Sequence, residues 1–123
     1  MINIYVVLGI LFFHWVFDFV FQTHKQSINK STSFSYLLEH TFTYSICWLP
    51  LSFIFGVSTD ASAMLLLFAP ITFVAHTATD YYTSKVNSQL WKEGDVHNFF
   101  VSIGFDQFLH FTQLLLTFYF LTK

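Results

Sequence analysis

The sequence contains no arginine and little charge of either sign. Five lysines and seven acidic residues make up 10% of the 123 residues, whereas hydrophobic residues make up 54%. A soluble domain carries roughly 25% charged residues, so this chain has too few to cover a water-facing surface. Its net charge of -2 also excludes the strongly basic surface that nucleic acid requires. The composition therefore predicts an integral membrane protein with no nucleic-acid partner.

Cysteine and targeting signals are equally scarce. Cys47 is the only cysteine, which excludes an internal disulfide and a cysteine-based zinc site. The first residues, MINIYVVLGILFF, carry neither a basic segment nor a small-residue cleavage site. They therefore predict a retained membrane helix instead of a secretory signal.

Long apolar runs are what the sequence has in abundance. Four runs approach or exceed the roughly 20 residues that a helix needs to cross a hydrocarbon core, at residues 2–22, 34–57, 61–82 and 99–121. A tight turn is expected at residues 58–60, and the third helix is expected to continue to about Leu90, before a helix stop at Gly94. We therefore expect an all-α fold, a single domain over residues 1–123 that forms a bundle of four antiparallel transmembrane helices with short loops.

The lysines predict an orientation for this bundle. The loop after the first run holds Lys25 and Lys30, and the loop after the third holds Lys85 and Lys92. Short loops that carry lysine remain in the cytoplasm. Both lysine-bearing loops are therefore expected there and both termini outside, in a bacterial inner membrane.

Ionisable residues inside the apolar runs repeat one spacing. Three runs carry a histidine and an aspartate four residues apart, namely His14/Asp18, His76/Asp80 and Asp106/His110. Chance placement would produce about half of one such pair, and the spacing puts both members on one helix face. His40 adds an imidazole on the second run. At 1.5 Å per residue, all seven groups lie between the helix midpoints and roughly 12 Å toward the lysine-bearing loops.

The free-energy cost of placing an aspartate in a bilayer indicates where these carboxylates must lie. Each aspartate deep in a bilayer costs about 2.5–3.5 kcal/mol, so three cost roughly 7–10 kcal/mol, as much as the whole stability of a small domain. The groups must therefore converge inside the bundle. A structural, hydrogen-bonded role is the better explanation for any one pair alone, but three pairs in one layer favour a functional site.

Four imidazoles and three carboxylates suit zinc, iron or manganese better than calcium or magnesium. We therefore expect one or two such ions as the cofactor. The predicted metal ligands are His14, Asp18, His40, His76, Asp80, Asp106 and His110. Residues expected to hydrogen-bond the free sides of these ligands are Gln22, Gln107, Tyr44, Thr79 and Gln113. By contrast, His24 and His97 are expected to be solvated loop residues and Glu39 an interfacial one.

Several segments resemble a known family. HWVFDFVFQ at 14–22, Lys30, LLEH at 37–40, HTATDYYTSK at 76–85 and FDQFLH at 105–110 are similar to the small membrane proteins catalogued as domain of unknown function 3307. The resemblance covers most of the chain and rests mainly on the HxxxDxxxQ and DQxxH motifs. It implies that nine positions belong together, with Lys30 and Lys85 beside them: His14, Asp18, Gln22, His40, His76, Asp80, Asp106, Gln107 and His110.

The resemblance has limits. The loop after Gln22, THKQS, departs from the family pattern, so no role for His24 is carried over. The family name implies no activity. A looser similarity of helix number and His/Asp spacing links the chain to membrane-bound metal-dependent hydrolases of bacteria, which suggests a type of chemistry.

Three functions remain open at this point. The first is a metal-dependent membrane hydrolase that acts on a lipid-like substrate entering from the bilayer. The second is a bundle that handles protons or ions, although the outer halves of the helices hold few ionisable groups for such a path. The third is a non-enzymatic membrane effector that binds another protein and uses the buried network only to hold the bundle together. Catalytic residues and oligomeric state are not assigned.

Overall fold

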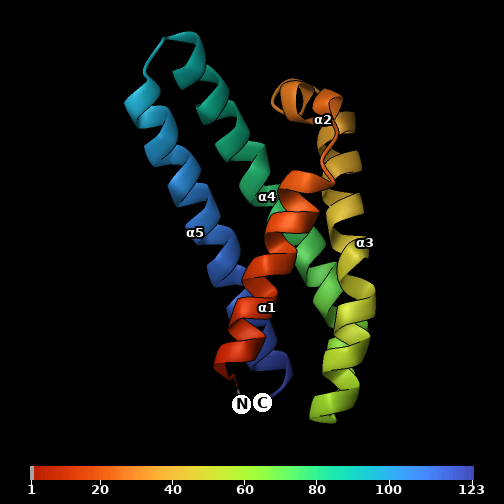
Figure 1. Ribbon diagram of the computed structural model, residues 1–123. Coiled ribbons are helices and arrows are strands. Elements are labelled where there is room, and N and C mark those ends of the chain that lie inside the picture. Colours follow the sequence, from red (N-terminus) through yellow and green to blue (C-terminus); the bar gives the residue numbers. More distant parts are fainter. Residues whose placement is uncertain (1) are drawn as a thin grey trace.

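Residues 2–123, the part of the chain described by the computed structural model, are almost entirely helical (Figure 1). No strand occurs in that range. The elements, in chain order, are α1 (Ile4–Trp15), a π-helical turn η1 (Val16–Val20), α2 (His24–Asn29), α3 (Phe34–Thr59), α4 (Ser62–Lys92) and α5 (Val96–Leu121).

Three of the helices, α3, α4 and α5, are long and apolar enough to cross a membrane. Together they indicate a membrane location, which agrees with the composition. The helix formed by α1 and η1, Ile4–Val20, is apolar but shorter. The predicted all-α fold is therefore confirmed, whereas the structure establishes three helices of spanning length and not the four that we expected.

Local sequence explains where the long helices end. Asp60 ends α3 in the left-handed conformation with φ 53°, inside the predicted turn. Gly94, with φ 73°, follows the end of α4 and confirms the predicted helix stop. The Asp95 side chain then accepts the backbone N–H of Asn98 and caps α5. Because of this cap, α5 begins at Val96, three residues before the predicted start.

The short helix α2 lies in a segment that we expected to be an irregular loop. The Thr23 hydroxyl accepts the backbone N–H of Gln26, and the Gln26 side chain accepts the backbone N–H of Thr23. This reciprocal capping box satisfies two donors that the start of a helix leaves free. The Thr-x-x-Gln pattern was a signal for α2 in the sequence.

Most of the packing joins helices that are neighbours along the chain, and α1 adds a contact with the last helix. α4 packs against both α3 and α5, while α1 packs against α5 and η1 against α3. The two termini and the α3–α4 turn lie at one end of the molecule, which we call the terminal end (Figure 1). α2 and the α4–α5 turn lie at the opposite end, the loop end, where the α4–α5 hairpin leans away from α2 and α3 (Figure 1).

An apolar core joins the helices toward the terminal end. It consists of Ile10, Phe17, Tyr44, Trp48, Met64, Phe68, Leu114 and Phe118. The Trp48 ring packs edge-on against Phe17, Tyr44 and Phe68, with ring centroids 5.2–6.2 Å apart. Large apolar side chains also cover the outer faces of the helices, as expected of a surface in contact with lipid. This core lies between the buried ionisable residues and the terminal end.

Candidate metal centre

Ionisable side chains replace the apolar core toward the loop end. All seven predicted ligands are buried there, with only 1–7% of each residue exposed. They come from four helical segments: α1 with η1, α3, α4 and α5. The structure therefore brings together in one buried layer the groups that the sequence placed at one depth.

Four of these residues, Asp18, His40, His76 and Asp80, form a tight group, which we call the first group. Each offers one ligand atom, and the four atoms lie within 4.8 Å of one another. His40 Nε2 lies 3.0 Å from Asp18 Oδ1 and 3.4 Å from Asp80 Oδ2. His76 Nε2 lies 3.5 Å from each of the same two oxygens, and the two Nε2 atoms are 3.3 Å apart.

The separations within the first group match those around a four-coordinate ion. Ligand atoms placed tetrahedrally at 2.0–2.1 Å from a metal are about 3.4 Å from one another. Five of the pairs in the first group measure 3.0–3.5 Å. Two imidazole nitrogens and two carboxylate oxygens also form a donor set that zinc and similar ions accept. The first group could therefore hold a metal ion.

Asp80 also belongs to a second group, with Asp106 and His110. His110 Nε2 lies 3.0 Å from Asp80 Oδ1 and 3.3 Å from Asp106 Oδ1. Asp80 therefore turns Oδ2 toward the first group and Oδ1 toward the second. A carboxylate shared in this way resembles the bridging ligands of di-metal sites in helix bundles.

Aromatic stacking holds His76 in place. Its ring stacks on Tyr44 and on His110, with centroids 4.0 Å and 4.2 Å away. Its Nδ1 is buried and has no hydrogen-bond partner within residues 2–123. Buried polar atoms are normally paired, so packing holds this ring where its own hydrogen bonding does not. Such a position is typical of a functional residue.

His14 lies beside the two groups found in residues 2–123 but belongs to neither. The Gln107 NH₂ donates to Asp106 Oδ2 at 3.0 Å, which leaves Gln107 Oε1 to accept from His14 Nε2 at 2.7 Å. His14 Nδ1 then accepts from the Tyr44 hydroxyl at 2.7 Å. His14 Nε2 is also 3.5 Å from Asp18 Oδ2. The structure thus places His14 as a hydrogen-bonding link, and its role as a metal ligand stays a prediction.

The other predicted hydrogen-bonding residues differ in where they lie. Thr79 contributes a backbone carbonyl 3.0 Å from the Thr83 hydroxyl, which in turn lies 2.6 Å from Asp106 Oδ1. Thr83 lies one turn after Thr79 on the same polar stripe of α4, so the sequence pattern indicates it as well.

Gln113 lies away from both groups. Its NH₂ donates to the hydroxyls of Thr72 and Thr117, at 3.2 Å and 2.9 Å, nearer the terminal end. No group in the described chain donates a hydrogen bond to its Oε1. His24, His97 and Glu39 are exposed and lie outside the buried layer.

Lys30 reaches the first group from outside the long helices. It caps the C-terminus of α2, and its Nζ donates to Asp80 Oδ2 at 3.0 Å. Its side chain is only 20% exposed. Burial opposes the charge of Lys30, but the Asp80 and Asp18 carboxylates outweigh burial, and the pKa of Lys30 lies above its ordinary value. A positive charge is thus held at the edge of the group.

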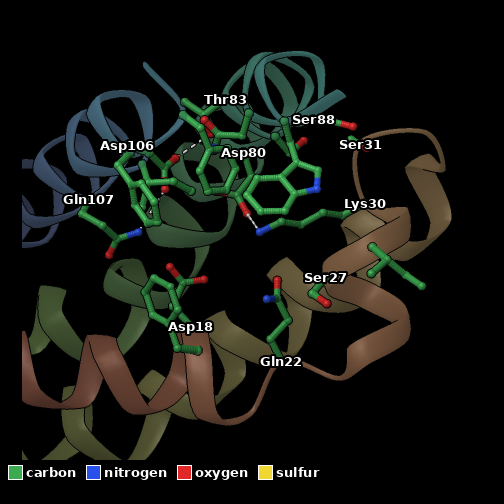
Figure 2. Close-up of a pocket in the computed structure, with 18 residues that line it drawn as sticks. Asp18, Gln22, Ser27, Lys30, Ser31, Asp80, Thr83, Ser88, Asp106 and Gln107 are labelled. Atoms are coloured by element: carbon green, nitrogen blue, oxygen red, sulfur yellow. Dashed lines mark hydrogen bonds and ion pairs between the residues drawn. The ribbon is translucent and has the colours of Figure 1, made fainter. Parts of the chain in front are cut away.

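A cavity of about 640 Å³ opens beside the two groups (Figure 2). Asp18, Asp80 and Asp106 all line it. In Figure 2, Asp18 faces Asp80 and Asp106 across the cavity, and Lys30 extends from the α2 side toward Asp80. The candidate metal centre is therefore open to a second molecule on the loop side.

Comparison with known proteins identifies the family. The family model described as "Protein of unknown function (DUF3307)" matches residues 6–123. The chain belongs to this family, as its motifs predicted. No curated protein and no solved structure matches the chain significantly. The function must therefore be argued from the site itself.

Proposed function

We propose that this member of the DUF3307 family is a membrane-embedded, metal-dependent hydrolase that acts on a lipid-like substrate. The observation that carries the proposal is the geometry of the first group, in which five separations of 3.0–3.5 Å relate two imidazole nitrogens and two carboxylate oxygens. These atoms are buried beside a cavity of about 640 Å³. Zinc, iron and manganese are the ions that such a donor set favours.

The proposal includes a fourth membrane crossing, by Ile4–Val20. Its 12 α-helical and 5 π-helical residues extend about 25 Å at the α-helical rise, so the bilayer must thin slightly around it. Tyr5, Leu8 and Phe12 on this helix are exposed, whereas Ile10 and His14 are buried, which suits a helix between lipid and bundle. The lysine-bearing loops then face the cytoplasm of a bacterial inner membrane, with both termini outside.

The residues around a bound ion would have different roles in the reaction. A bound ion supplies a Lewis acid and a hydroxide near neutral pH. Asp106 borders the cavity and contacts Thr83 and Gln107, so it is placed to take a proton from water. The Tyr44–His14–Gln107 chain of hydrogen bonds orients it. If the protein loads two ions, Asp106 and His110 are instead ligands of the second.

The apolar core favours an enclosed site over an ion path. Trp48, Phe68 and Leu114 are fully buried on the terminal side of the two groups and pack in one cluster. Thr72, Gln113 and Thr117 form a small hydrogen-bonded group on that side, but none of them is ionisable. A proton or ion path needs a continuous line of polar groups or water through that half of the bundle. We therefore expect proteoliposomes that contain the protein to show no flux of protons or divalent ions. Measurable flux would favour the ion-handling alternative.

Metal analysis of protein purified in detergent tests the proposal. We expect about one zinc, iron or manganese ion per chain, or two if the second group is loaded. The double variant His76→Ala/Asp80→Asn should lose the ion, whereas His97→Ala, which removes an exposed histidine, should keep it. A metal-free wild type, or equal metal in the wild type and the double variant, would contradict the metal site. Hydrolysis of lipid esters or lipid phosphates that stops with a chelator then tests the reaction.

A further inference from the structure

Beyond the acidic residues, the two long walls of the cavity differ in chemistry. α4 contributes mainly small polar side chains, among them Thr83, Asn87 and Ser88, with Trp91 near its end. α5 contributes Phe99, Phe100 and Ile103 before it reaches Asp106 and Gln107. Figure 2 shows Thr83 and Ser88 on the same side of the cavity, above the acidic residues. A cavity with one polar and one apolar wall fits an amphiphilic molecule better than a wholly polar or wholly apolar one.

The position along α4 places this cavity at the level of lipid head groups. α4 has 31 residues and extends roughly 46 Å, against roughly 30 Å for a hydrocarbon core. Its loop-end part must therefore reach the membrane surface. Trp91, near the end of α4, lines the cavity and is 60% exposed, as expected of a tryptophan at the interface.

Three polar atoms of the cavity lining have no partner in the protein. Gln22 Oε1, Ser84 Oγ and Asn87 Oδ1 are buried without a hydrogen bond to any group in residues 2–123. All three residues line the cavity, and Ser84 is only 7% exposed. Buried polar atoms are normally satisfied, and two of these three can only accept. Because each of these atoms is itself buried, the hydroxyl groups of an occupant can donate to it only after the side chain turns toward the cavity.

Lys30 supplies the one positive charge among the described residues that line the cavity. Its present partner, Asp80, lies 3.0 Å away and is also a member of both candidate metal groups. The Lys30 ammonium has three N–H donors and uses one of them on Asp80, so it can bind a phosphate oxygen as well. Lysine binds phosphate well as a point charge.

The cavity also has a route for a lipid to enter. Within residues 2–123, α2 packs against α3 but not against α4 or α5. The α4–α5 hairpin leans away from α2 at the loop end (Figure 1). Side chains of two lysines bridge this gap, Lys30 to Asp80 and Lys85 to the Ser31 carbonyl. A lipid could therefore pass between α2 and the hairpin without breaking any packing between long helices.

We propose that the cavity binds an anionic phospholipid with a hydroxyl-bearing head group. The phosphate lies at Lys30 beside the two groups, and an acyl chain follows Phe99, Phe100 and Ile103 of α5. The head-group hydroxyls bind Gln22, Ser84 and Asn87 after these side chains turn toward the cavity. This inference names the substrate class of the site and rests on the function proposed above. A free phosphate would leave the apolar wall unused, and an uncharged lipid would make no charge-assisted contact with Lys30.

Binding of three short-chain probes tests the inference without any turnover. The probes are diether-linked dihexyl phosphatidylglycerol, the uncharged dihexylglycerol and glycerol phosphate without chains, each titrated into purified protein and followed by native mass spectrometry. Because one charge-assisted hydrogen bond and the chain contacts are lost in turn, we expect the phosphatidylglycerol to bind at least about tenfold more tightly than either other probe. Equal binding of the uncharged lipid, or of glycerol phosphate, would overturn the inference.

Two variants and one control separate the cavity from general effects of charge. Lys30→Met should weaken phosphatidylglycerol binding about tenfold, whereas Lys25→Met removes an exposed lysine from the same short helix and should leave it unchanged. Ser88→Trp fills the cavity from α4 without changing charge and should also weaken binding. Equal binding by the Lys30 and Lys25 variants, or full binding by Ser88→Trp, contradicts the inference.

Metal content measured in the same samples distinguishes the two proposals. The titration is run on protein loaded with zinc and on protein stripped with a chelator. Metal binding without the lipid preference would overturn this inference alone. The lipid preference in a protein that never binds metal would overturn the proposed hydrolase and support the cavity as a phospholipid-binding site.

Discussion

The loop half and the terminal half of the bundle use the same three long helices in opposite ways. Toward the terminal end, α3, α4 and α5 bury Trp48, Phe68 and Leu114. Toward the loop end, the same helices bury His40, His76 and His110. The change from apolar to ionisable packing takes four to eight residues, or about 6–12 Å of helix. If the loop half binds metal as proposed, substitutions in the two halves should affect stability and metal binding separately.

The first helix changes its geometry where the halves meet. It is α-helical through Trp15 and π-helical from Val16 to Val20, with the Phe21 N–H donating to the Val16 carbonyl at 3.0 Å. Asp18 lies inside this turn and reaches His40 on α3. Single π-helical turns occur frequently at functional sites. The π-helical turn therefore carries one residue of the apolar core, Phe17, and one residue of the first group, Asp18.

Trp48→Ala should have the largest effect, and that effect should be on stability alone. The ring is fully buried among Phe17, Tyr44 and Phe68, and removing a large core aromatic costs about 3–5 kcal/mol. Unfolding in SDS measures the loss, and metal per folded chain should not change. Phe120→Ala, at a side chain that is 64% exposed, should stay within about 0.5 kcal/mol of wild type. Parallel loss of metal and stability would mean that the halves are not separable.

Asp80→Asn should have the next largest effect, on metal affinity. The substitution keeps the size of the side chain but removes a carboxylate from both groups. Because even the outer partners of ligands are worth 10–100-fold, we expect at least about a 100-fold loss. Competition with a chelator of known affinity measures it. Ser52→Ala, at a buried polar residue whose hydroxyl bonds the Trp48 carbonyl, is the control and should bind metal normally.

Two glutamines of α5, one at the site and one away from it, should differ in their effect on metal affinity, by less than the loss expected for Asp80→Asn. Gln107 contacts His14 and Asp106, whereas Gln113 contacts Thr72 and Thr117. Gln107→Leu should lower metal affinity about tenfold because it frees Asp106 and His14 from their shared link. Gln113→Leu should not change it. The same chelator titration tests both, and equal losses would show that α5 influences the site by packing and not by this hydrogen bond.

The smallest effect is expected at Asp95, at the start of α5. The Asn98 side chain and backbone N–H hold the pKa of Asp95 below its ordinary value. Because its pKa is lowered, the ionised Asp95 cap stabilises the helix at every pH above the usual aspartate pKa of about 3.9. This stabilisation is lost as the pH falls through the lower pKa of the folded protein. Asp95→Ala should therefore speed hydrogen exchange in the first turn of α5 near neutral pH. At strongly acidic pH the variant and wild type should exchange alike.

The helices were predictable where their causes are local. Apolar length indicated α3, α4 and α5, and Gly94 indicated the end of α4. The Thr-x-x-Gln pattern at Thr23 and Gln26 is typical of a helix start, but the polar composition of the segment favoured a loop, so α2 was not predicted. No such signal marks η1, because valine, phenylalanine and aspartate have similar α-helix propensities and none of them favours a π-helical turn over an α-helix. Packing of Asp18 toward α3 accompanies the π-helical turn, and packing cannot be read from a local pattern.

The sequence by itself determined that seven ionisable groups share a buried layer, because helical spacing sets their faces and depths, and the cost of exposing them to lipid excludes any other place. The spacing put a histidine beside an aspartate on each of three helices. The tertiary structure keeps Asp106 beside His110. The histidine nearest to Asp18 is His40, however, and the one nearest to Asp80 is His110, each on another helix. The tertiary structure also separated His14 from the two groups and brought Lys30 to Asp80. Distances between helices depend on how the helices rotate and pack against one another, and a single helix pattern carries no information about that.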